Sequence, residues 1–215
     1  MSGDLVIFGA WYLSHAIAEA AELSGWRVVG FVDPDPPDQI ATLREIPPQA
    51  AVIAAIGDNF VRALVCSRLL EHGRWLTTIT HPSAVVSRSA SIGPASYLGE
   101  SAVVRSNATV GRGALVNAGA VVSHDCAIGE FVTFGPNAAT GGHVTIGAKT
   151  TIGVGASVRP WVRIGDQCEI GAGAAVASDI GNDMVAVGVP ARTRERGSKS
   201  PGPDEQSNWS GNAIW

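Results

Sequence analysis

Residues 86–181 begin VSRSAS-IGPASY-LGESAV and continue as sixteen consecutive hexapeptides without an insertion. The first residue of each hexapeptide is aliphatic in fourteen of the sixteen, and the second is glycine in ten. The fifth residue is Ala, Ser, Thr, Cys or Val in fifteen. A fixed six-residue period predicts a solenoid of short parallel strands, with one strand and one corner per hexapeptide. We expect the aliphatic residues to fill the interior, the small residues to sit where the walls converge, and the glycines to relieve steric strain near the corners.

The first 80 residues have a different pattern, in which short apolar runs alternate with helical segments. Strands are expected at residues 5–8, 27–32, 51–56 and 75–79, and helices at residues 15–23 and 60–72. This alternation predicts a parallel, Rossmann-like α/β sheet. The expected organisation is therefore a Rossmann-like domain over residues 1–80, a solenoid over residues 81–191, and a tail over residues 192–215. The tail is rich in Ser, Gly, Pro and Asn, a composition typical of disorder.

Charge, hydropathy and cysteine content exclude some classes of partner. A formal net charge of -4 and a pI near 5.7 disfavour nucleic acid. No apolar run is long enough to predict a signal peptide or a membrane span, so we expect a cytoplasmic protein without a membrane partner. Cys126 and Cys168 are predicted on different walls two turns apart, at a separation of about 10 Å, which is too far for a disulfide. Reduced cysteines, with Cys66 the third, fit a cytoplasmic location.

The solenoid period also predicts which distant residues are neighbours. With three hexapeptides per turn, residues eighteen apart stack on adjacent turns, so the backbones of His124 and Gly142 should lie about 5 Å apart. A histidine has a pKa near neutrality and can take a proton from an attacking amine or hydroxyl. The sequence alone leaves open that His124 is an ordinary polar residue of a solenoid turn.

Several motifs together resemble a known family. They are residues 6–10, 31–33, 55–59 with Arg62, 81–86, the Val-Ser-His-Asp-Cys-Ala-Ile-Gly segment 122–129, and the Gly-Val-Pro-Ala-Arg segment 188–192. Over roughly residues 4–192 the chain resembles the sialic acid O-acetyltransferase and UDP-amino-sugar N-acetyltransferase family of bacterial sugar-modifying enzymes. The resemblance implies an all-β left-handed parallel β-helix and a homotrimer with coenzyme A between neighbouring solenoids. It also implies acetyl-CoA as the donor, a small-molecule amine or hydroxyl as the acceptor, and no metal.

The resemblance also implies roles for individual residues. His124 would be the general base, the Gly142 N–H would polarise the thioester carbonyl, and Asp125 would orient the imidazole. The last role requires a local corner, because adjacent strand residues point to opposite faces. Candidate coenzyme contacts are Gly142, His143, Lys149, Arg163 and Arg192, each of which can also be a solvated surface residue. Candidate acceptor contacts are Gly9, Ala10, Asp33, Asp58 and Asn59, although Asp33 can be a solvated strand end and Asp58 and Asn59 can simply start a helix.

Three alternatives remain open at this point. The family's glycine-rich phosphate turn reads Gly-Ala-Trp-Tyr-Leu-Ser at residues 9–14, with bulky residues where small ones are expected, so the acceptor can be a sugar without a nucleotide or a natural-product intermediate. The chain can be a non-catalytic scaffold or binding protein. A metal-dependent solenoid enzyme, like the gamma-class carbonic anhydrases, needs three histidines around zinc, and only His124 and His143 are near neighbours in the repeats.

Overall fold

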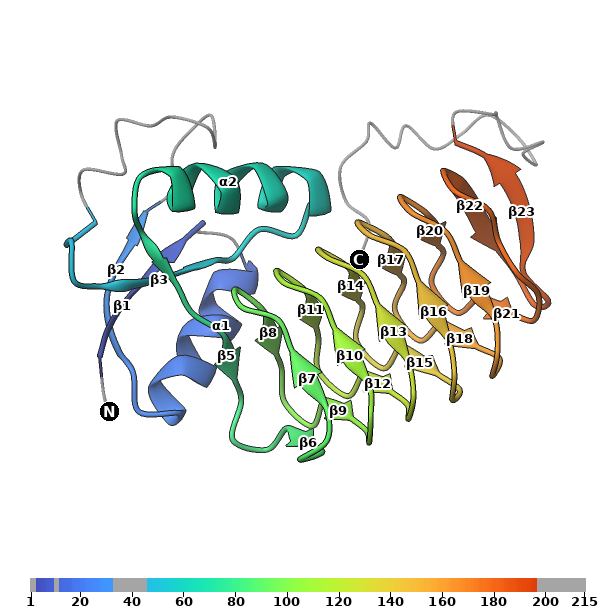
Figure 1. Ribbon diagram of the computed structural model, residues 1–215, viewed down its shortest axis with the longest axis horizontal. Helices are drawn as coiled ribbons and strands as arrows, with labels where there is room; N and C mark the ends of the chain where they lie inside the picture. Colours follow the sequence, from blue (N-terminus) through green and yellow to red (C-terminus); the bar gives the residue numbers. More distant parts are fainter. Residues whose placement is uncertain (1–2, 10–11, 33–45, 197–215) are drawn as a thin grey trace.

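The computed structural model describes residues 3–9, 12–32 and 46–196, and Figure 1 shows two units that lie side by side. A small sheet with two helices forms the N-terminal unit, and a long parallel β-helix forms the other. Two candidate acceptor residues, Ala10 and Asp33, lie outside the described residues, as do residues 197–215 of the expected tail.

The N-terminal unit is a four-stranded parallel sheet with the strand order β2-β1-β3-β4. Alternate residues of β1 face opposite sides, so Leu5 packs in the cluster that contains Ile17 of α1, and Val6 packs in the cluster that contains Val65 of α2. Both faces of the sheet are therefore covered, which explains the unbroken apolar run of β1. This confirms the Rossmann-like α/β prediction, and the elements are β1 (Asp4–Phe8), α1 (Tyr12–Leu23), β2 (Arg27–Val32), β3 (Ala51–Ala54), α2 (Asn59–Glu71) and β4 (Trp75–Leu76).

Neither helix, nor any other in the described ranges, is long and apolar enough to cross a membrane.

The β-helix has three walls, which we call first, second and third after the walls that contain β6, β7 and β8. The first wall holds β6 (Val85–Val86), β9 (Val103–Val104), β12 (Val121–Val122), β15 (Ala139–Thr140), β18 (Ser157–Val158) and β21 (Ala175–Val176). The second wall holds β7 (Ser91–Ile92), β10 (Thr109–Val110), β13 (Ala127–Ile128), β16 (Thr145–Ile146) and β19 (Arg163–Ile164). The third wall holds β5 (Ile79–Thr80), β8 (Tyr97–Leu98), β11 (Leu115–Val116), β14 (Thr133–Phe134), β17 (Thr151–Ile152), β20 (Glu169–Ile170), β22 (Met184–Val187) and β23 (Arg192–Glu195).

The strand register confirms the predicted stacking. Val121 lies opposite both Val103 and Ala139, so each coil contains eighteen residues, or three hexapeptides. The aliphatic and small positions of successive coils form one continuous buried cluster inside the walls. Cys126 and Cys168 belong to this cluster, on different walls, and both are free thiols, as is Cys66. The predicted interior and the absence of a bond between these cysteines are therefore confirmed.

The repeat glycines relieve steric strain near the corners, as expected, by leaving room for the next coil. A Cβ added at Gly111 would stand 2.6 Å from the carbonyl carbon of Gly129, on the next coil. Glycine is needed there because the coils approach closely, and not because the corner needs a left-handed backbone. The left-handed positions lie two residues further on and carry glycine in some turns, as at Gly113 with φ 65°, and other residues in many, such as Ala95 with φ 61° and Phe131 with φ 56°.

The expected fourth strand at residues 75–79 is divided between the two units. Trp75–Leu76 pairs with β3, whereas Ile79–Thr80 pairs with β8 of the third wall. Thr80 stands six residues before Val86, so the hexapeptide register already begins there. The solenoid strands thus start before residue 81, inside the range assigned to the N-terminal domain.

The C-terminal end of the solenoid departs from the repeat. Val158 pairs with Val176, and Ile164 pairs with Ile180. The step from the first wall to the second is therefore six residues on one coil and only four on the last. The chain then forms β22 and reverses into β23, which pairs with β22 in antiparallel register. Residues 192–195 were assigned to a disordered tail, and that assignment is wrong, because β22 leaves an open edge for them to pair with.

A buried arginine joins the two units. Arg62 of α2 is fully buried and donates to the carbonyl oxygens of Gly113 and Phe131 on the solenoid, at 2.8 and 3.1 Å. It also donates to the Ile56 carbonyl at 2.8 Å and to Asn59 Oδ1 at 2.7 Å. Burial lowers the pKa of Arg62 to about 10, so the guanidinium is still charged at neutral pH. Each nitrogen of the rigid guanidinium group donates to an oxygen, and these hydrogen bonds compensate for the hydration that the charged group loses on burial.

Replacing Arg62 by Met should destabilise the protein strongly, because several buried carbonyl oxygens would lose their donor. We expect a loss of about 3 kcal/mol or more in the free energy of unfolding, and a melting temperature lower by about 6 °C or more. Arg68→Met on the same helix is the matched control, since Arg68 is half exposed and pairs only with Glu71 at 3.5 Å. Equal melting temperatures for the two variants in scanning calorimetry would contradict the role given to Arg62.

Candidate active site

The candidate site lies in the turns between the first and second walls, at residues 105–108, 123–126, 141–144 and 159–162, which we call the first edge. One position of each turn has a left-handed backbone, with φ 60° at Asn107, 56° at Asp125, 58° at His143 and 68° at Trp161. These four residues are eighteen apart and therefore form a column along the edge. His124 precedes the Asp125 position and, one coil on, Gly142 precedes His143.

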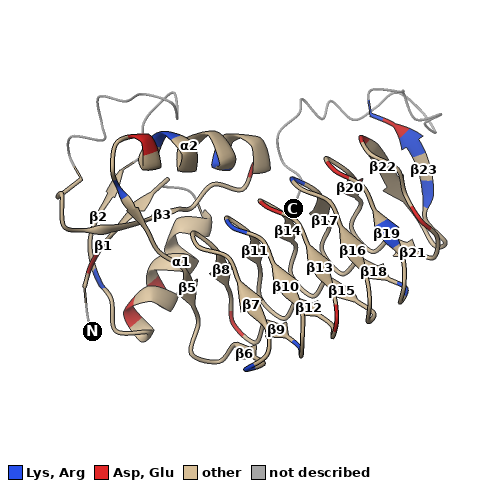
Figure 2. Ribbon diagram, in the orientation of Figure 1, with Lys and Arg blue, Asp and Glu red and all other residues tan. Residues whose placement is uncertain are grey.

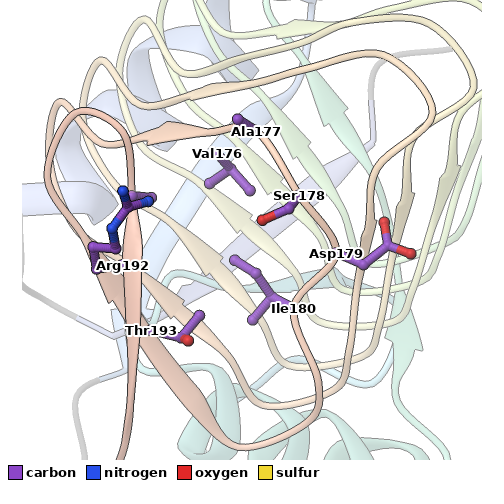
Figure 3. Close-up of a pocket in the computed structure, with 8 residues that line it drawn as sticks. Val176, Ala177, Ser178, Asp179, Ile180, Arg192 and Thr193 are labelled. Atoms are coloured by element: carbon purple, nitrogen blue, oxygen red, sulfur yellow. The ribbon is translucent and has the colours of Figure 1, made fainter.

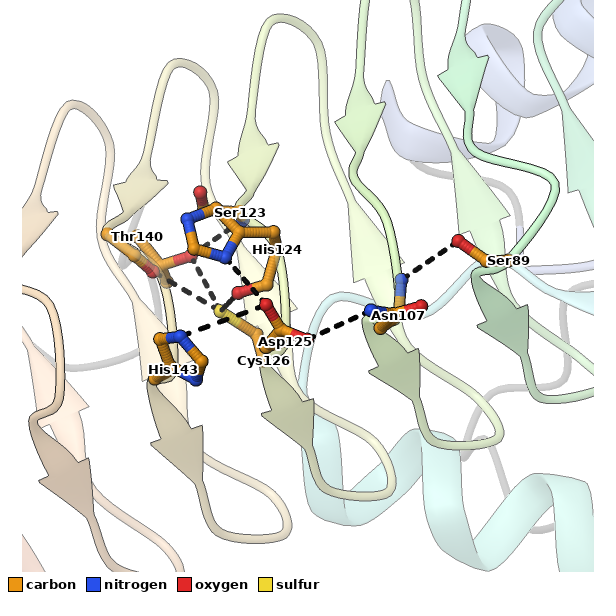
Figure 4. A network of polar contacts seen from close by, with 9 residues as sticks. Ser89, Asn107, Ser123, His124, Asp125, Cys126, Thr140 and His143 are labelled. Atoms are coloured by element: carbon orange, nitrogen blue, oxygen red, sulfur yellow. Dashed lines mark hydrogen bonds and ion pairs between the residues drawn. The ribbon is translucent and has the colours of Figure 1, made fainter.

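His124 and Asp125 form a hydrogen-bonded pair although they are adjacent in sequence (Figure 4). His124 Nδ1 lies 2.7 Å from Asp125 Oδ2. The left-handed backbone of Asp125 supplies the corner that brings the two side chains together. An ionised carboxylate only accepts hydrogen bonds, so the neutral imidazole carries its proton on Nδ1 and keeps a free electron pair on Nε2.

The carboxylate of Asp125 is held from two sides. The hydrogen bond from His124 lowers the pKa of Asp125, and a hydrogen bond from the Asn107 amide lowers it further. The Asn107 Nδ2 atom lies 3.1 Å from Asp125 Oδ1, which leaves Oδ2 for the imidazole. The ionised form is therefore favoured near neutral pH, and it fixes which His124 nitrogen carries the proton.

Gly142 lies directly against the His124 ring. A Cβ added at Gly142 would stand 2.5 Å from His124 Nε2, so only glycine leaves room for the imidazole in this position. The Gly142 carbonyl accepts the N–H of Trp161 at 3.0 Å, whereas the Gly142 N–H donates to no acceptor in the described part of the chain. The predicted proximity of His124 and Gly142 is confirmed, and a backbone N–H without an acceptor in the described residues stands beside the His124 ring.

His143 and Trp161 extend the site along the same edge. The His143 ring is edge-on to the His124 ring, with centroids 5.3 Å apart, and is stacked on Trp161 at 3.8 Å. His143 thus faces the same side as His124, as expected. Asn107 and Trp161 also belong to this column, although neither was a predicted site residue. The eighteen-residue spacing could have found them, because Asn107 lies one coil before Asp125 and Trp161 lies one coil after His143.

The candidate coenzyme contacts divide between two places. Arg192 lines a cavity of about 150 Å³ at the end of the solenoid, together with Ser178, Asp179 and Thr193 (Figure 3). Arg163 is exposed on β19, and its backbone N–H donates to Asp179 Oδ1 at 2.8 Å. Lys149 lies on another edge, with its ammonium 5.2 Å from the centre of the Phe60 ring.

The candidate acceptor contacts are used within the fold. Gly9 donates to the Val32 carbonyl at 2.7 Å, and an added Cβ would stand 2.7 Å from the Ala55 oxygen. Asp58 caps α2 by accepting the N–H of Phe60 and that of the next residue at 2.8 and 2.9 Å, which is its alternative helix-starting role.

Asn59 is buried between the two units instead of lining a cleft. It donates to the Lys149 carbonyl and to Thr151 Oγ1, and it accepts from Arg62 and Thr133. Both ends of its amide are bonded, so its contacts connect the two units.

Comparisons with known proteins identify the family to which this fold belongs. Residues 143–178 match the family model described as bacterial transferase hexapeptide (six repeats). The structure of PerB from Caulobacter crescentus, solved with CoA and GDP-perosamine, is 33% identical to this chain, with a TM-score of 0.85 over 89% of this chain and 97% of that one. The chain belongs to the hexapeptide-repeat acetyltransferases. Hexapeptide repeats of this family form left-handed β-helices, so the expected handedness also stands.

Two further relatives of this acetyltransferase support the assignment. The acetyltransferase domain of PglB from Neisseria gonorrhoeae, solved with acetyl coenzyme A, is 30% identical, with a TM-score of 0.81 over 89% of this chain and 99% of that one. UDP-N-acetylbacillosamine N-acetyltransferase from Bacillus subtilis is 36% identical over 63 residues, which span 29% of this chain and 29% of that protein.

Replacing Gly142 by Ala should displace the His124 ring from this acetyltransferase's site. The fold should survive, because the clash is with the end of a flexible side chain, and we expect a stability change within about 1 kcal/mol. A crystal structure of the variant should show the bond between His124 and Asp125 broken or lengthened. Gly181→Ala is the control, since an added Cβ there meets nothing within 4 Å. An unmoved ring would contradict the close packing described above.

Proposed function

We propose that this acetyltransferase moves the acetyl group of acetyl-CoA to the amine of an amino sugar carried on a nucleotide. The observation that carries the proposal is the His124 imidazole, with its Nε2 free to accept a proton and Gly142 against it. PerB and PglB supply the rest of the support, since one was solved with CoA and a nucleotide sugar and the other with acetyl coenzyme A. The Caulobacter enzyme has also been solved with one histidine replaced by Asn or Ala.

In the proposed reaction, the acceptor nitrogen attacks the thioester carbonyl carbon while His124 Nε2 takes the amine proton. The carbon–sulfur bond then breaks, and the proton passes to the departing coenzyme A thiolate. The free N–H of Gly142 donates to the carbonyl oxygen as negative charge develops there. Asp125 keeps the ring in its orientation and stabilises the imidazolium that forms.

The donor would lie along the first edge. The cavity beside Arg192 is three coils from His124, or about 14 Å along the solenoid axis. An extended coenzyme A spans this distance with its thioester at His124 and its phosphates near Arg192 and Arg163. His143 and Trp161 stand between the two ends and would contact the linking arm. Lys149, on another edge, is no longer a candidate in this arrangement.

The acceptor would lie near the carboxyl end of β1, where parallel α/β sheets bind ligands. Gly9 marks this end, and Ala10, Asp33 and Asp58 are the other proposed contacts. Tyr12 stands where the family has a small residue, and its side chain is 76% exposed. A nucleotide diphosphate would have to pass this side chain to reach the backbone.

The position of the N-terminal unit favours a homotrimer. This unit packs on the third wall, with Tyr97 and Leu115 buried in a cluster with α1. The first edge lies opposite the third wall, so an acceptor held by the N-terminal unit would reach His124 of a neighbouring subunit instead of its own. The outward positions of the first wall are uncharged and available for that contact, and Figure 2 shows few charges along it. They are Val85, Val103, Val121, Ala139, Ser157 and Ala175.

We place this reaction in the cytoplasm, since the three buried thiols are free and acetyl-CoA would be the donor.

Replacing His124 by Ala should lower kcat by about 10²- to 10⁴-fold, since the base that takes the amine proton is lost. Acetyl-CoA binding should be nearly unchanged, because the ring contacts the reacting atoms and not the phosphates. The control is His72→Ala, at an exposed histidine that bonds the Arg68 carbonyl. An unchanged kcat in a free-thiol release assay would reject His124 as the base.

Calorimetric titration with acetyl-CoA, then with UDP- and GDP-linked amino sugars, tests donor and acceptor separately. We expect micromolar binding of acetyl-CoA, weakened about tenfold in Arg192→Gln by the loss of a charged phosphate contact. Binding of a nucleotide-linked amino sugar, and no binding of the free sugar, is the expected acceptor result. Binding of the free sugar alone would reject the nucleotide requirement, and absence of acetyl-CoA binding would reject the donor.

A further inference from the structure

The first edge brings together three side chains that are all metal ligands. One ligand atom from each of His124, Asp125 and His143 lies within 4.8 Å of the others. Counting histidines alone, as in the sequence analysis, finds only two ligands here and overlooks the carboxylate. Imidazole and carboxylate are ligands that zinc accepts.

We propose that His124, Asp125 and His143 bind a zinc ion in the substrate-free protein, and that the bound ion disables His124 as a base. This proposal concerns an inhibitory ion and assigns zinc no part in the transfer reaction. The described residues that would supply ligands are His124 through Nδ1, Asp125 through Oδ2 and His143 through Nε2.

The coil stacking holds these ligands at a fixed spacing. Asp125 and His143 occupy the same left-handed position on adjacent coils, with φ 56° and 58°. The His143 N–H donates to the His124 carbonyl at 3.0 Å, which joins the two turns directly. No loop has to close to form the site, so little conformational entropy opposes binding.

Neighbouring side chains also hold each ligand in orientation (Figure 4). Asn107 bonds Asp125 Oδ1 and leaves Oδ2 directed at both rings, 2.7 Å from His124 Nδ1 and 3.8 Å from His143 Nε2. Trp161 stacks on His143 with the two ring planes 9° apart. Such outer contacts orient metal ligands and raise affinity.

The distances are close to those that zinc requires. With bonds of about 2.0 to 2.1 Å, neighbouring ligand atoms of a tetrahedral zinc site lie about 3.4 Å apart. The separations of Asp125 Oδ2 from His124 Nδ1 and His143 Nε2, 2.7 and 3.8 Å, differ from this by less than an ångström. The ligand atoms of the two histidines lie within 4.8 Å of each other, so side-chain rotation would have to bring them closer. Between 35% and 48% of each side chain is exposed, so the ion can enter and water can fill the fourth position.

Binding at Nδ1 would change the chemistry of His124. The single proton of the neutral ring moves from Nδ1 to Nε2 when zinc takes the Nδ1 electron pair. Nε2 then carries that proton as a donor and cannot accept the proton of an amine. A bound zinc ion and a working base are therefore mutually exclusive on this ring.

The test is calorimetric titration of Zn²⁺ into the untagged full-length protein without acetyl-CoA or acceptor, with Mg²⁺ as the control ion. We expect one Zn²⁺ per chain with micromolar affinity or tighter and no heat from Mg²⁺, which prefers oxygen ligands. His143→Gln should weaken Zn²⁺ binding at least about tenfold, and Asn107→Ala should weaken it about tenfold through the orientation of Asp125. His72→Gln, at an exposed histidine elsewhere, is the matched control and should leave binding unchanged.

Absence of Zn²⁺ binding, or equal binding by wild type and His143→Gln, would overturn the proposal. Folding of each variant is checked by its melting temperature, and Asp125→Asn supplies a second ligand variant if His143→Gln melts early. Zinc binding and melting temperature are measured without catalytic turnover. A negative result for zinc binding can therefore be told apart from a negative result for the proposed acetyl transfer. Where transfer is measured, Zn²⁺ should abolish it and a chelator should restore it, whereas transfer unaffected by saturating Zn²⁺ would overturn the disabling of His124.

Discussion

The structure depends above all on one coil stacking upon the next at a fixed interval of eighteen residues. Buried aliphatic side chains and backbone hydrogen bonds hold this interval, as between the His143 N–H and the His124 carbonyl. Because the interval is constant, a side chain on one coil has a predictable neighbour on each adjacent coil. The His124 site is formed by the stacked turns between the first and second walls, and no separate loop contributes to it. A one-residue insertion within a strand, such as β13, would turn the side chains that follow it in that strand to the opposite face.

A second constraint fixes where the N-terminal unit stands. Arg62 and Asn59 bond carbonyl and hydroxyl groups on the side of the solenoid remote from His124. Since Arg62 is buried and each donor has an acceptor, the two units form a stiff connection and not a hinge. In a single chain, the N-terminal unit that we propose to bind the acceptor and the proposed base His124 lie on opposite sides of the solenoid. A complete site of the proposed kind is a property of the assembly.

The sequence predicts repeated features well and single contacts poorly. The solenoid, its interior and the proximity of His124 to Gly142 all follow from one period, which is why the structure confirms them. The pairing of His124 with Asp125 required a corner, and the left-handed backbone at Asp125 provides it. Asn107 and Trp161 were within reach of the same period, since each stands eighteen residues from a recognised site residue. The hydrogen bonds of Asn59 and Arg62 could not be predicted from the period, because they join the solenoid to a segment that has no repeat.

Solenoids of parallel strands have an inherent hazard at their ends, where an unpaired strand can recruit another chain. Here the third wall ends on β23, which runs against the direction of every other strand in that wall and consists of Arg, Thr, Arg and Glu. A further coil could not add to it in the parallel register that the solenoid requires, and its charges would resist burial. The short last turn and the reversed strand thus act as a terminator that limits growth of the helix. The same segment that carries Arg192 towards the proposed donor also covers the outer edge of β22 at the end of the third wall.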